Sequence, residues 1–240
     1  MEKPVKMGIL GGMGPMATSF LFDRIIRHTE AASDQDHIDL VILNRASMPD
    51  RTEAIQKGTG ESVIRQAVSD CKAMEQMGVE YIAIPCNTSH YFYDEIQKQT
   101  QAKLIHMVRE TVEYAKRDCE GLTRLGIMAT DGTVSADVYG RECRALGIEP
   151  VYPSAARQRD VMHLIYEEIK KGRRGEEDRF YRVVSELTGS GCERIVLACT
   201  ELSYFRQYYT LPSYVIDSTD VLVRCFIEKA GKTYVEGDRT

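Results

Sequence analysis

The sequence predicts an α/β protein of two similar lobes, each with a mainly parallel sheet flanked by helices. Short β-branched runs alternate with segments of helical period along the whole chain. The frame Gly-x-Glu-x-Ile occurs twice, from Gly78 and from Gly191, and in each copy a cysteine stands four residues after the isoleucine. A second pair of matching runs, Met-Gly-Ile-Leu and Leu-Gly-Ile-Met, surrounds Gly8 and Gly126. These repeats indicate two copies of one α/β unit.

We expect the first lobe to cover residues 1–115 and the second to cover residues 116–213, related by a pseudo-twofold axis. Residues 214–240 are expected to return to the first lobe. In parallel sheets ligands bind at the carboxyl ends of strands, so the active site is expected in the cleft between the lobes.

Each predicted strand is a short β-branched run, and each predicted helix is an amphipathic segment. The strands are expected at 5–10, 38–43, 81–84, 103–106, 124–128, 148–152, 194–198 and 214–216. The helices are expected at 16–28, 61–77, 137–146, 161–170, 180–187 and 217–231.

The composition excludes several classes of function. The net charge is −5 and the basic residues are scattered, so we expect no nucleic-acid partner. The densest basic run, 170–174, precedes three acidic residues and is interpreted as a solvated turn between helices. No apolar run is long enough for a membrane span, and no signal-peptide core is present. The seven cysteines form no CxxC pair, which favours reduced cytoplasmic thiols over a disulfide framework or a metal site.

Cys86 and Cys199 are the candidate catalytic residues, because each follows an apolar strand and precedes an expected helix start. A thiol near a helix N-terminus has a lowered pKa, so one sulfur can act as a base while the other holds its proton. Two thiols on opposite sides of one carbon, about 6 to 8 Å apart, would suffice for racemisation without a cofactor. The other five cysteines are expected to be buried core residues: Cys71, Cys119, Cys143, Cys192 and Cys225.

A glycine-rich loop at residues 11–14 follows the first strand and imitates a dinucleotide-binding fingerprint. Pro15 at the helix start weakens that match, and so does the absence of an acidic residue after the second strand. Arg45 at that place keeps an NADP-dependent reductase open as an alternative. The favoured interpretation is a loop around Met13 whose amide groups point at a small carboxylate.

Other candidates lie just past the predicted strands. Arg51 is expected in a loop, where its guanidinium would bind a carboxylate. Thr130 is expected to cap a helix, with Thr133 beside it. His90, four residues after Cys86, is a candidate for orienting that thiol.

Five motifs resemble the cofactor-independent aspartate/glutamate racemase family, the aspartate racemases above all: GILGGMGPMAT, MPDRTEAI, IPCNTSH, LGIMATDGT and VLACTEL. The resemblance covers nearly the whole chain. It implies racemisation of an acidic amino acid, no cofactor, and a homodimer. It also implies catalytic roles for Cys86 and Cys199 and substrate-binding roles for Arg51, Asn87, Thr88 and Thr200. Four further residues are expected to bind substrate, namely Met13, Thr130, Thr133 and Glu201.

One departure concerns a lysine that relatives carry near the start of the helix after the sixth strand. Residues 156–160 contain no lysine here, and Arg159 or Arg157 is expected to replace its charge. Strict specificity for aspartate is therefore not predicted. The alternatives are a hydantoin racemase or maleate isomerase with the same thiol pair, and a small-acid-binding protein without turnover.

Overall fold

The computed structural model describes residues 6–237, which form two compact units. One unit runs to Met107 and resumes at Thr219, and the other spans Val108–Ser218. The units therefore divide earlier than the 115/116 boundary expected from the sequence. The chain also returns to the first unit later than residue 214, because residues 215–217 form a strand of the second sheet.

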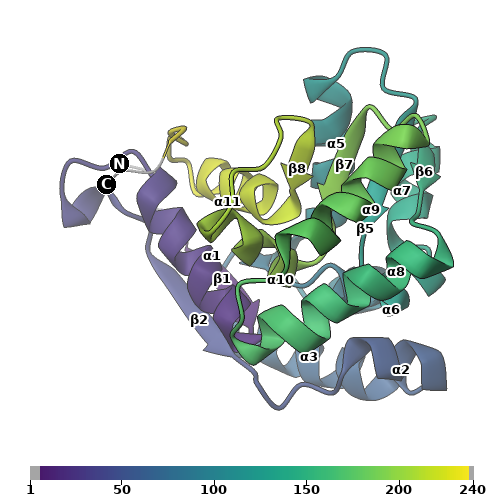
Figure 1. The fold of residues 1–240 in the computed structure, drawn as a ribbon. Coiled ribbons are helices and arrows are strands. Elements are labelled where there is room, and N and C mark those ends of the chain that lie inside the picture. Colours follow the sequence, from purple (N-terminus) through teal and green to yellow (C-terminus); the bar gives the residue numbers. More distant parts are fainter. Residues whose placement is uncertain (1–5, 238–240) are drawn as a thin grey trace. The chain divides into compact units, whose positions relative to one another are not determined.

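Each unit contains a four-stranded sheet in which every pairing is parallel (Figure 1). The first has the order β2-β1-β3-β4 and the second the order β6-β5-β7-β8, so the two sheets share one topology. The strands are β1 Met7–Gly11, β2 Leu40–Asn44, β3 Tyr81–Ala83, β4 Lys103–Ile105, β5 Arg124–Met128, β6 Glu149–Val151, β7 Arg194–Leu197 and β8 Val215–Asp217. All eight predicted strands are confirmed, although residue 5 lies outside the described residues.

The repeated sequence frames occupy the same register in both sheets. Ile82 of the first Gly-x-Glu-x-Ile frame pairs with Gly8, and Ile195 of the second pairs with Gly126. The first glycine of each frame has a left-handed backbone, with φ of 83° at Gly78 and 82° at Gly191. A glycine is favoured there because a side chain is strained at positive φ. The duplication seen in the sequence is thus a duplication of helix, turn and strand.

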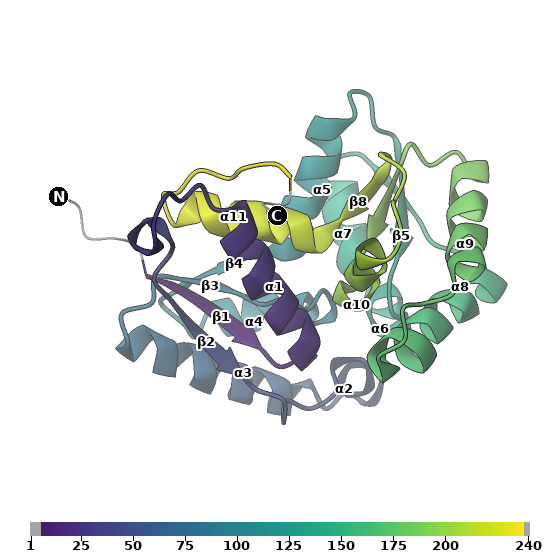
Figure 2. The same ribbon diagram turned by 60° about the vertical axis from the view of Figure 1, so that its left-hand side comes forward.

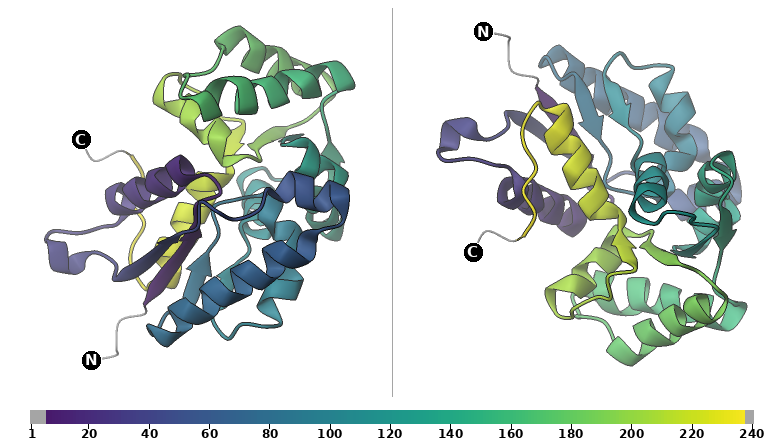
Figure 3. Two further views of the ribbon diagram at one scale, coloured as in Figure 1. Left: turned by 90° about the horizontal axis from the view of Figure 1, so that it is seen from below. Right: turned by 90° about the horizontal axis from the view of Figure 1, so that it is seen from above.

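In the first unit, helices α1 (Pro15–His28) and α11 (Ser218–Lys229) lie on one face of the sheet (Figures 2 and 3). Helix α3 (Gly60–Gln76) lies on the other face and packs against α4 (Tyr93–Gln97). Arg24 of α1 forms an ion pair of 2.8 Å with Asp220 of α11. The helices predicted at 16–28, 61–77 and 217–231 are confirmed.

In the second unit, α9 (Glu177–Gly189) packs on β5 and β7, and α7 (Val138–Ala145) packs on β6. Both helices were predicted. Helix α8 (Ala155–Met162) continues into a π-helical segment, η3 (His163–Glu168), and a 3₁₀ turn, η4 (Ile169–Lys171). The helix predicted from 161 therefore begins earlier, because Ser154 caps its first turn by accepting from Arg157 N.

The bounds of the remaining helices were not predicted, although helix starts were expected after Cys86, Thr130 and Cys199, and most of these helices are short. They are α2 Arg51–Lys57, α5 Met107–Asp118, α6 Asp131–Ser135, α10 Thr200–Ser203, η1 Asp34–Asp36, η2 Thr88–Phe92 and η5 Tyr204–Gln207. Within residues 6–237, no helix has both the length and the apolar character that crossing a bilayer requires.

Candidate active site

Cys86 lies just past β3 in the first unit and is 7% exposed. The chain turns there into η2, where the amides of Ser89 and His90 donate to the carbonyls of Cys86 and Asn87 at 3.2 and 3.1 Å. Asn87 and Thr88 are buried beside it. The helix start predicted after Cys86 is confirmed, as a 3₁₀ turn that leads into α4.

His90 fixes the main chain of Cys86. Its Nδ1 lies 3.0 Å from the Cys86 carbonyl oxygen, and its Nε2 lies 3.1 Å from the amide nitrogen of Met107. Because an amide can only donate, Nε2 accepts, and Nδ1 therefore carries the hydrogen that is donated to Cys86. The orienting role expected of His90 acts on the peptide of Cys86.

The glycine loop is tied to its own surroundings and to the Cys86 turn. Gly12 has φ of 93°, and a Cβ there would lie 2.3 Å from the main chain of Arg45. Its amide donates to Thr18 Oγ1 at 2.8 Å, so the expectation that this amide points at a ligand is wrong. Ser89 Oγ donates to Met13 Sδ at 3.4 Å, which joins this loop to the Cys86 turn.

Arg51 is the first residue of α2, so its predicted loop position is wrong. The reason is Asp50, whose side chain accepts from Glu53 N and caps the helix. Arg51 is 9% exposed, and its guanidinium donates to the carbonyls of Pro49 at 2.9 Å and Met13 at 3.3 Å. The structure thus places a buried cation beside the glycine loop.

Cys199 follows β7 in the second unit, at the place that Cys86 has after β3. It is 7% exposed and is the N-cap residue of α10. Its thiol donates to Glu201 Oε2 at 3.0 Å, and the hydroxyl of Thr200 lies 3.4 Å from the same oxygen. A thiol, a hydroxyl and a carboxylate are therefore grouped within three consecutive residues.

Lys170 is a member of this group that the sequence did not reveal. Its Nζ lies 3.5 Å from Glu201 Oε1 and 4.6 Å from the ring centroid of Tyr166. The interpretation of residues 170–174 as a solvated turn is confirmed, because Lys170, Lys171, Arg173 and Arg174 are all exposed, but the ammonium of Lys170 also reaches Glu201. The π-helical segment before η4 changes the helical phase, which no local pattern in the sequence indicates.

Burial raises the pKa of the Cys199 thiol well above its ordinary value, and the Glu201 carboxylate adds to the rise. The Glu201 amide and the Lys170 ammonium each lower the pKa of Cys199, but these effects are smaller than the rise. The expectation that a helix N-terminus lowers the pKa is wrong for Cys199, because α10 has only four residues and its first turn carries a carboxylate. In the resting protein Cys199 holds its proton.

The expected helix cap at Thr130 is confirmed. Its hydroxyl accepts from the amide of Thr133 at 3.3 Å, and both threonines are buried. Gln158, which the sequence did not single out, donates to the carbonyl of Ala129 at 2.9 Å. Arg159 is exposed on α8, and Arg157 pairs with Asp160 at 2.7 Å. The cation whose charge acts on the Cys199 thiol is Lys170, which pairs with Glu201.

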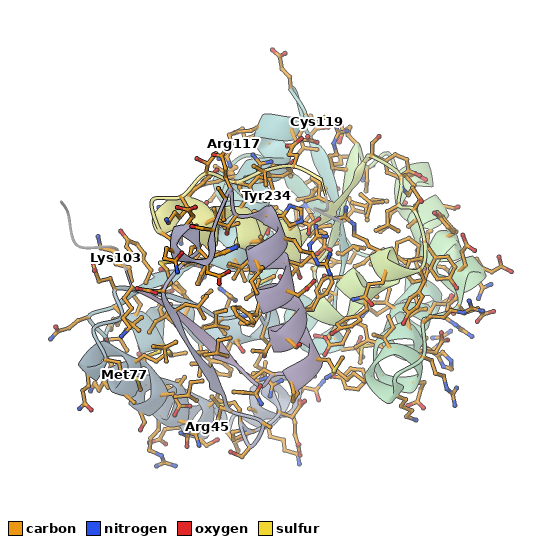
Figure 4. All side chains as sticks on the ribbon, turned by 90° about the vertical axis from the view of Figure 1, so that its left-hand side faces the viewer. Arg45, Met77, Lys103, Arg117, Cys119 and Tyr234 are labelled. Atoms are coloured by element: carbon orange, nitrogen blue, oxygen red, sulfur yellow. The ribbon has the colours of Figure 1, made fainter. Side chains whose placement is uncertain are left out.

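The remaining cysteines are mostly core residues, as predicted. Burial raises the pKa of Cys71 and of Cys143 to about 12, and that of Cys192 to about 11. Cys119 is only half-buried, at the periphery of its unit (Figure 4), so the prediction of a core position is wrong there. In the described part of the chain, no three His, Cys, Asp or Glu side chains are grouped to hold a metal ion.

The two sheets have the same topology, and a buried cysteine follows the equivalent strand in each, Cys86 after β3 and Cys199 after β7. The protein is therefore a duplicated α/β protein with two matched thiols. The family model for Asp/Glu/Hydantoin racemase matches residues 10–226, and the chain belongs to this family. It is an isomerase of the racemase class. This assignment takes the place of the NADP-dependent reductase that the glycine loop had left open as an alternative.

Individual relatives agree with this assignment. The broad specificity amino-acid racemase RacX of Bacillus subtilis is 26% identical over 222 residues, which cover 91% of this chain and 95% of RacX. The aspartate racemase of Picrophilus torridus is 28% identical with a TM-score of 0.79, and the match covers 96% of each chain. An aspartate racemase homologue from Pyrococcus horikoshii has the same fold, with a TM-score of 0.76 at 24% identity over 94% of this chain and 99% of that one.

Proposed function

We propose that the protein interconverts L- and D-aspartate, and less readily glutamate, with two thiols and no cofactor. The observation that carries the proposal is the equivalence of Cys86 after β3 and Cys199 after β7, in sheets of the same order. The similarity to the Picrophilus torridus aspartate racemase supports aspartate as the substrate.

In this mechanism one thiolate removes the α-proton, and the other thiol delivers a proton to the opposite face of the carbon. Each sulfur must approach the α-carbon to about 3 to 3.5 Å. The carbanion beside the carboxylate needs aligned donors, which Asn87, Thr88 and Thr200 would supply.

The two carboxylates of the substrate need cations. Arg51 is buried beside the glycine loop and would bind one of them in a bidentate manner. Lys170 would meet the other, because its Nζ lies 3.5 Å from Glu201, whose carboxylate contacts Cys199. The charge assigned from the sequence to Arg159 is therefore reassigned in this proposal.

Incubation in deuterated water with L-aspartate, and separately with L-glutamate, tests the function. Proton NMR should show loss of the α-proton signal while chiral chromatography shows the D-isomer, faster with aspartate. Loss of signal without D-isomer would indicate one-sided exchange and contradict the two-thiol mechanism. If neither acid loses its α-proton signal or forms the D-isomer, the result would favour a hydantoin racemase, a maleate isomerase or a binding protein.

A broader specificity is the second candidate, and the match to RacX over 95% of its length favours it. The same exchange assay with uncharged amino acids distinguishes the two. Exchange limited to the acidic amino acids would support aspartate racemisation. Comparable rates with alanine, serine and methionine would support a broad-specificity enzyme.

We also propose a homodimer in the cytoplasm, where reducing conditions keep both thiols available. Sedimentation velocity at micromolar concentration should give a mass of twice the chain's 27.2 kDa. A single species of 27.2 kDa would contradict the dimer.

A further inference from the structure

Glu201 is a buried carboxylate, 8% exposed, in contact with a buried thiol. A buried carboxylate is unfavourable unless it is paired and hydrogen-bonded. Here one oxygen accepts from the Cys199 thiol and the other faces the Lys170 ammonium. The two carboxylate oxygens of Glu201 therefore have different partners: Oε2 contacts the thiol and Oε1 contacts the ammonium.

We propose that Glu201 is the positioning residue that controls the proton of Cys199, and that Lys170 holds the Glu201 carboxylate in place for this purpose. The carboxylate holds the thiol proton while Cys199 waits as an acid, and takes that proton when Cys199 must act as a base. The catalytic part of this inference rests on the proposed racemisation.

The transfer is balanced. The S–H bond of Cys199 breaks and an O–H bond forms at Glu201 Oε2, so the negative charge moves from oxygen to sulfur and no co-reactant is needed. When the thiolate accepts the α-proton of the substrate, a neutral thiol is restored. Glu201 then returns its own proton to solvent or product and is again the ionised partner of Lys170.

Within the described part of the second unit, the other polar and charged groups near this pair have contacts of their own. Burial and the Glu201 charge raise the pKa of Tyr204, which follows α10, to about 12, so it stays neutral. Tyr166 contributes a ring face to Lys170. Asp217 of β8 accepts from Ser203 at 2.7 Å and lies 4.0 Å from the Arg206 guanidinium. Glu201 and Lys170 are thus the charged pair that acts on Cys199.

Site-resolved alkylation measures this control without substrate. The protein is treated with iodoacetamide between pH 6 and 10.5, and the rate of modification of the Cys199 peptide is quantified by mass spectrometry. The midpoint of labelling is defined as the pH at which this rate reaches one fixed value, the same for all variants. Glu201→Gln keeps the shape of the side chain and removes its charge, so the midpoint of Cys199 labelling should fall by at least one pH unit. Labelling at pH 8 should then be about tenfold faster than in the wild type.

Lys170→Met should move the same midpoint upward, because it removes the positive charge and leaves Glu201 in place. Opposite shifts in the two variants are the signature of electrostatic control, since a packing defect would expose the thiol in both. The proposal is overturned if both variants shift the midpoint in the same direction, or if neither shifts it. If Glu201→Gln does not fold, the upward shift in Lys170→Met decides the question alone.

Lys171→Met is the matched control. Lys171 is the neighbouring lysine and also forms an ion pair, with Glu167 at 2.5 Å, but both partners are exposed. Its substitution should leave the Cys199 midpoint unchanged, because solvent screens this pair.

The kinetic test is separate from the labelling test. If the wild type racemises aspartate, Glu201→Gln should lower kcat/KM about 10²-fold and shift the pH profile downward. Because the equilibrium constant between enantiomers is one, the loss must be equal in both directions. Failure of the wild type to racemise would contradict the proposed function and leave the labelling result valid. Racemisation by Glu201→Gln at the wild-type rate and with an unshifted pH profile would overturn the role of Glu201 alone.

Discussion

At the scale of single residues, the two matched cysteines have different neighbours. Cys86 is followed by the neutral Asn87 and Thr88, and its peptide is held by His90. Cys199 donates to the Glu201 carboxylate, which is itself paired with Lys170. The same position in a duplicated fold thus gives two thiols with different chemical surroundings.

Substitution of either thiol tests its catalytic role. Cys86→Ala and Cys199→Ala should each lower racemisation about 10²- to 10⁴-fold, because each removes one proton-transfer group. Chiral chromatography of aspartate incubations measures the effect. Cys119→Ala, at the half-buried thiol, should retain full activity. Wild-type rates in either of the first two variants would contradict the two-thiol mechanism.

Contacts between residues close in the sequence were predictable, and contacts between residues far apart in the sequence were not. The cap at Thr130 was predictable because donor and acceptor lie three residues apart. Lys170 was not, because its contact with Glu201 depends on the path of the π-helical segment between α8 and η4. The residue type of Arg51 predicted its candidacy, but its helical position depends on the cap formed by Asp50, which the predicted loop did not include.

At the scale of elements, glycines in the central strands let helices pack closely on each sheet. A Cβ at Gly8 would lie 2.8 Å from Val79 Cγ1 and 3.0 Å from Met74 Sδ. A Cβ at Gly126 would lie 3.1 Å from Ile195 Cγ1 and 3.2 Å from Leu187 Cδ1. The matching glycines of the two repeats are therefore a packing requirement of both units.

Gly8→Ala should destabilise the protein by about 1 to 3 kcal/mol through overpacking, and Gly126→Ala by less. Urea unfolding followed by circular dichroism measures both. Gly189→Ala is the control, because nothing lies within 4 Å of its Cβ position at the end of α9. It should be neutral or slightly stabilising. Equal effects at all three positions would contradict the packing argument.

His90 joins two parts of the first unit through its ring, the turn after Cys86 and the last residue of the unit's first segment, Met107. His90→Leu should destabilise the protein by about 1 to 3 kcal/mol, because it removes two buried hydrogen bonds, one from the Met107 amide and one to the Cys86 carbonyl. Thermal unfolding measures the change. Tyr91→Ala, at the adjacent and 50% exposed side chain, should change stability far less. A larger effect at Tyr91 would contradict the role of His90.

Strands were predicted better than short helices for a physical reason. A buried parallel strand is a continuous apolar run, which the sequence displays directly. Segments such as α10 and η2 have four and five residues, too few to show a helical period. Their positions depend on the strand that precedes them, and that is why only their starting points were predicted.

At the scale of the whole molecule, buried thiols make stability depend on alkaline pH. The pKa of Cys71 and of Cys143 rises from an ordinary 9.0 to about 12 on burial. Each raised pKa contributes stability that is complete below pH 9 and is lost as the pH rises toward 12, because the unfolded thiol ionises first. The folded protein is therefore expected to weaken above pH 9.

The free energy of unfolding should fall by about 1.4 kcal/mol per pH unit for each such thiol between pH 9.5 and 10.5. Urea unfolding at pH 8, 9.5 and 10.5 measures this slope. Cys71→Ala should reduce this slope by the contribution of one thiol, about 1.4 kcal/mol per pH unit, whatever its effect on the free energy of unfolding at pH 8. An unchanged slope in that variant would show that Cys71 is not held protonated by the fold.

The common strand order of the two sheets has a consequence for how this chemistry could arise. Two identical half-length chains related by a twofold axis would carry the same residue after both cysteines, so a glutamate beside one thiol would stand beside the other. Joining the halves in a single chain removes that constraint. Asn87 and Thr88 can then follow one cysteine while Thr200 and Glu201 follow the other. Fusion of the two half-length genes would thus allow a symmetric fold to place different side chains beside the two cysteines, one set for each enantiomer of an amino acid.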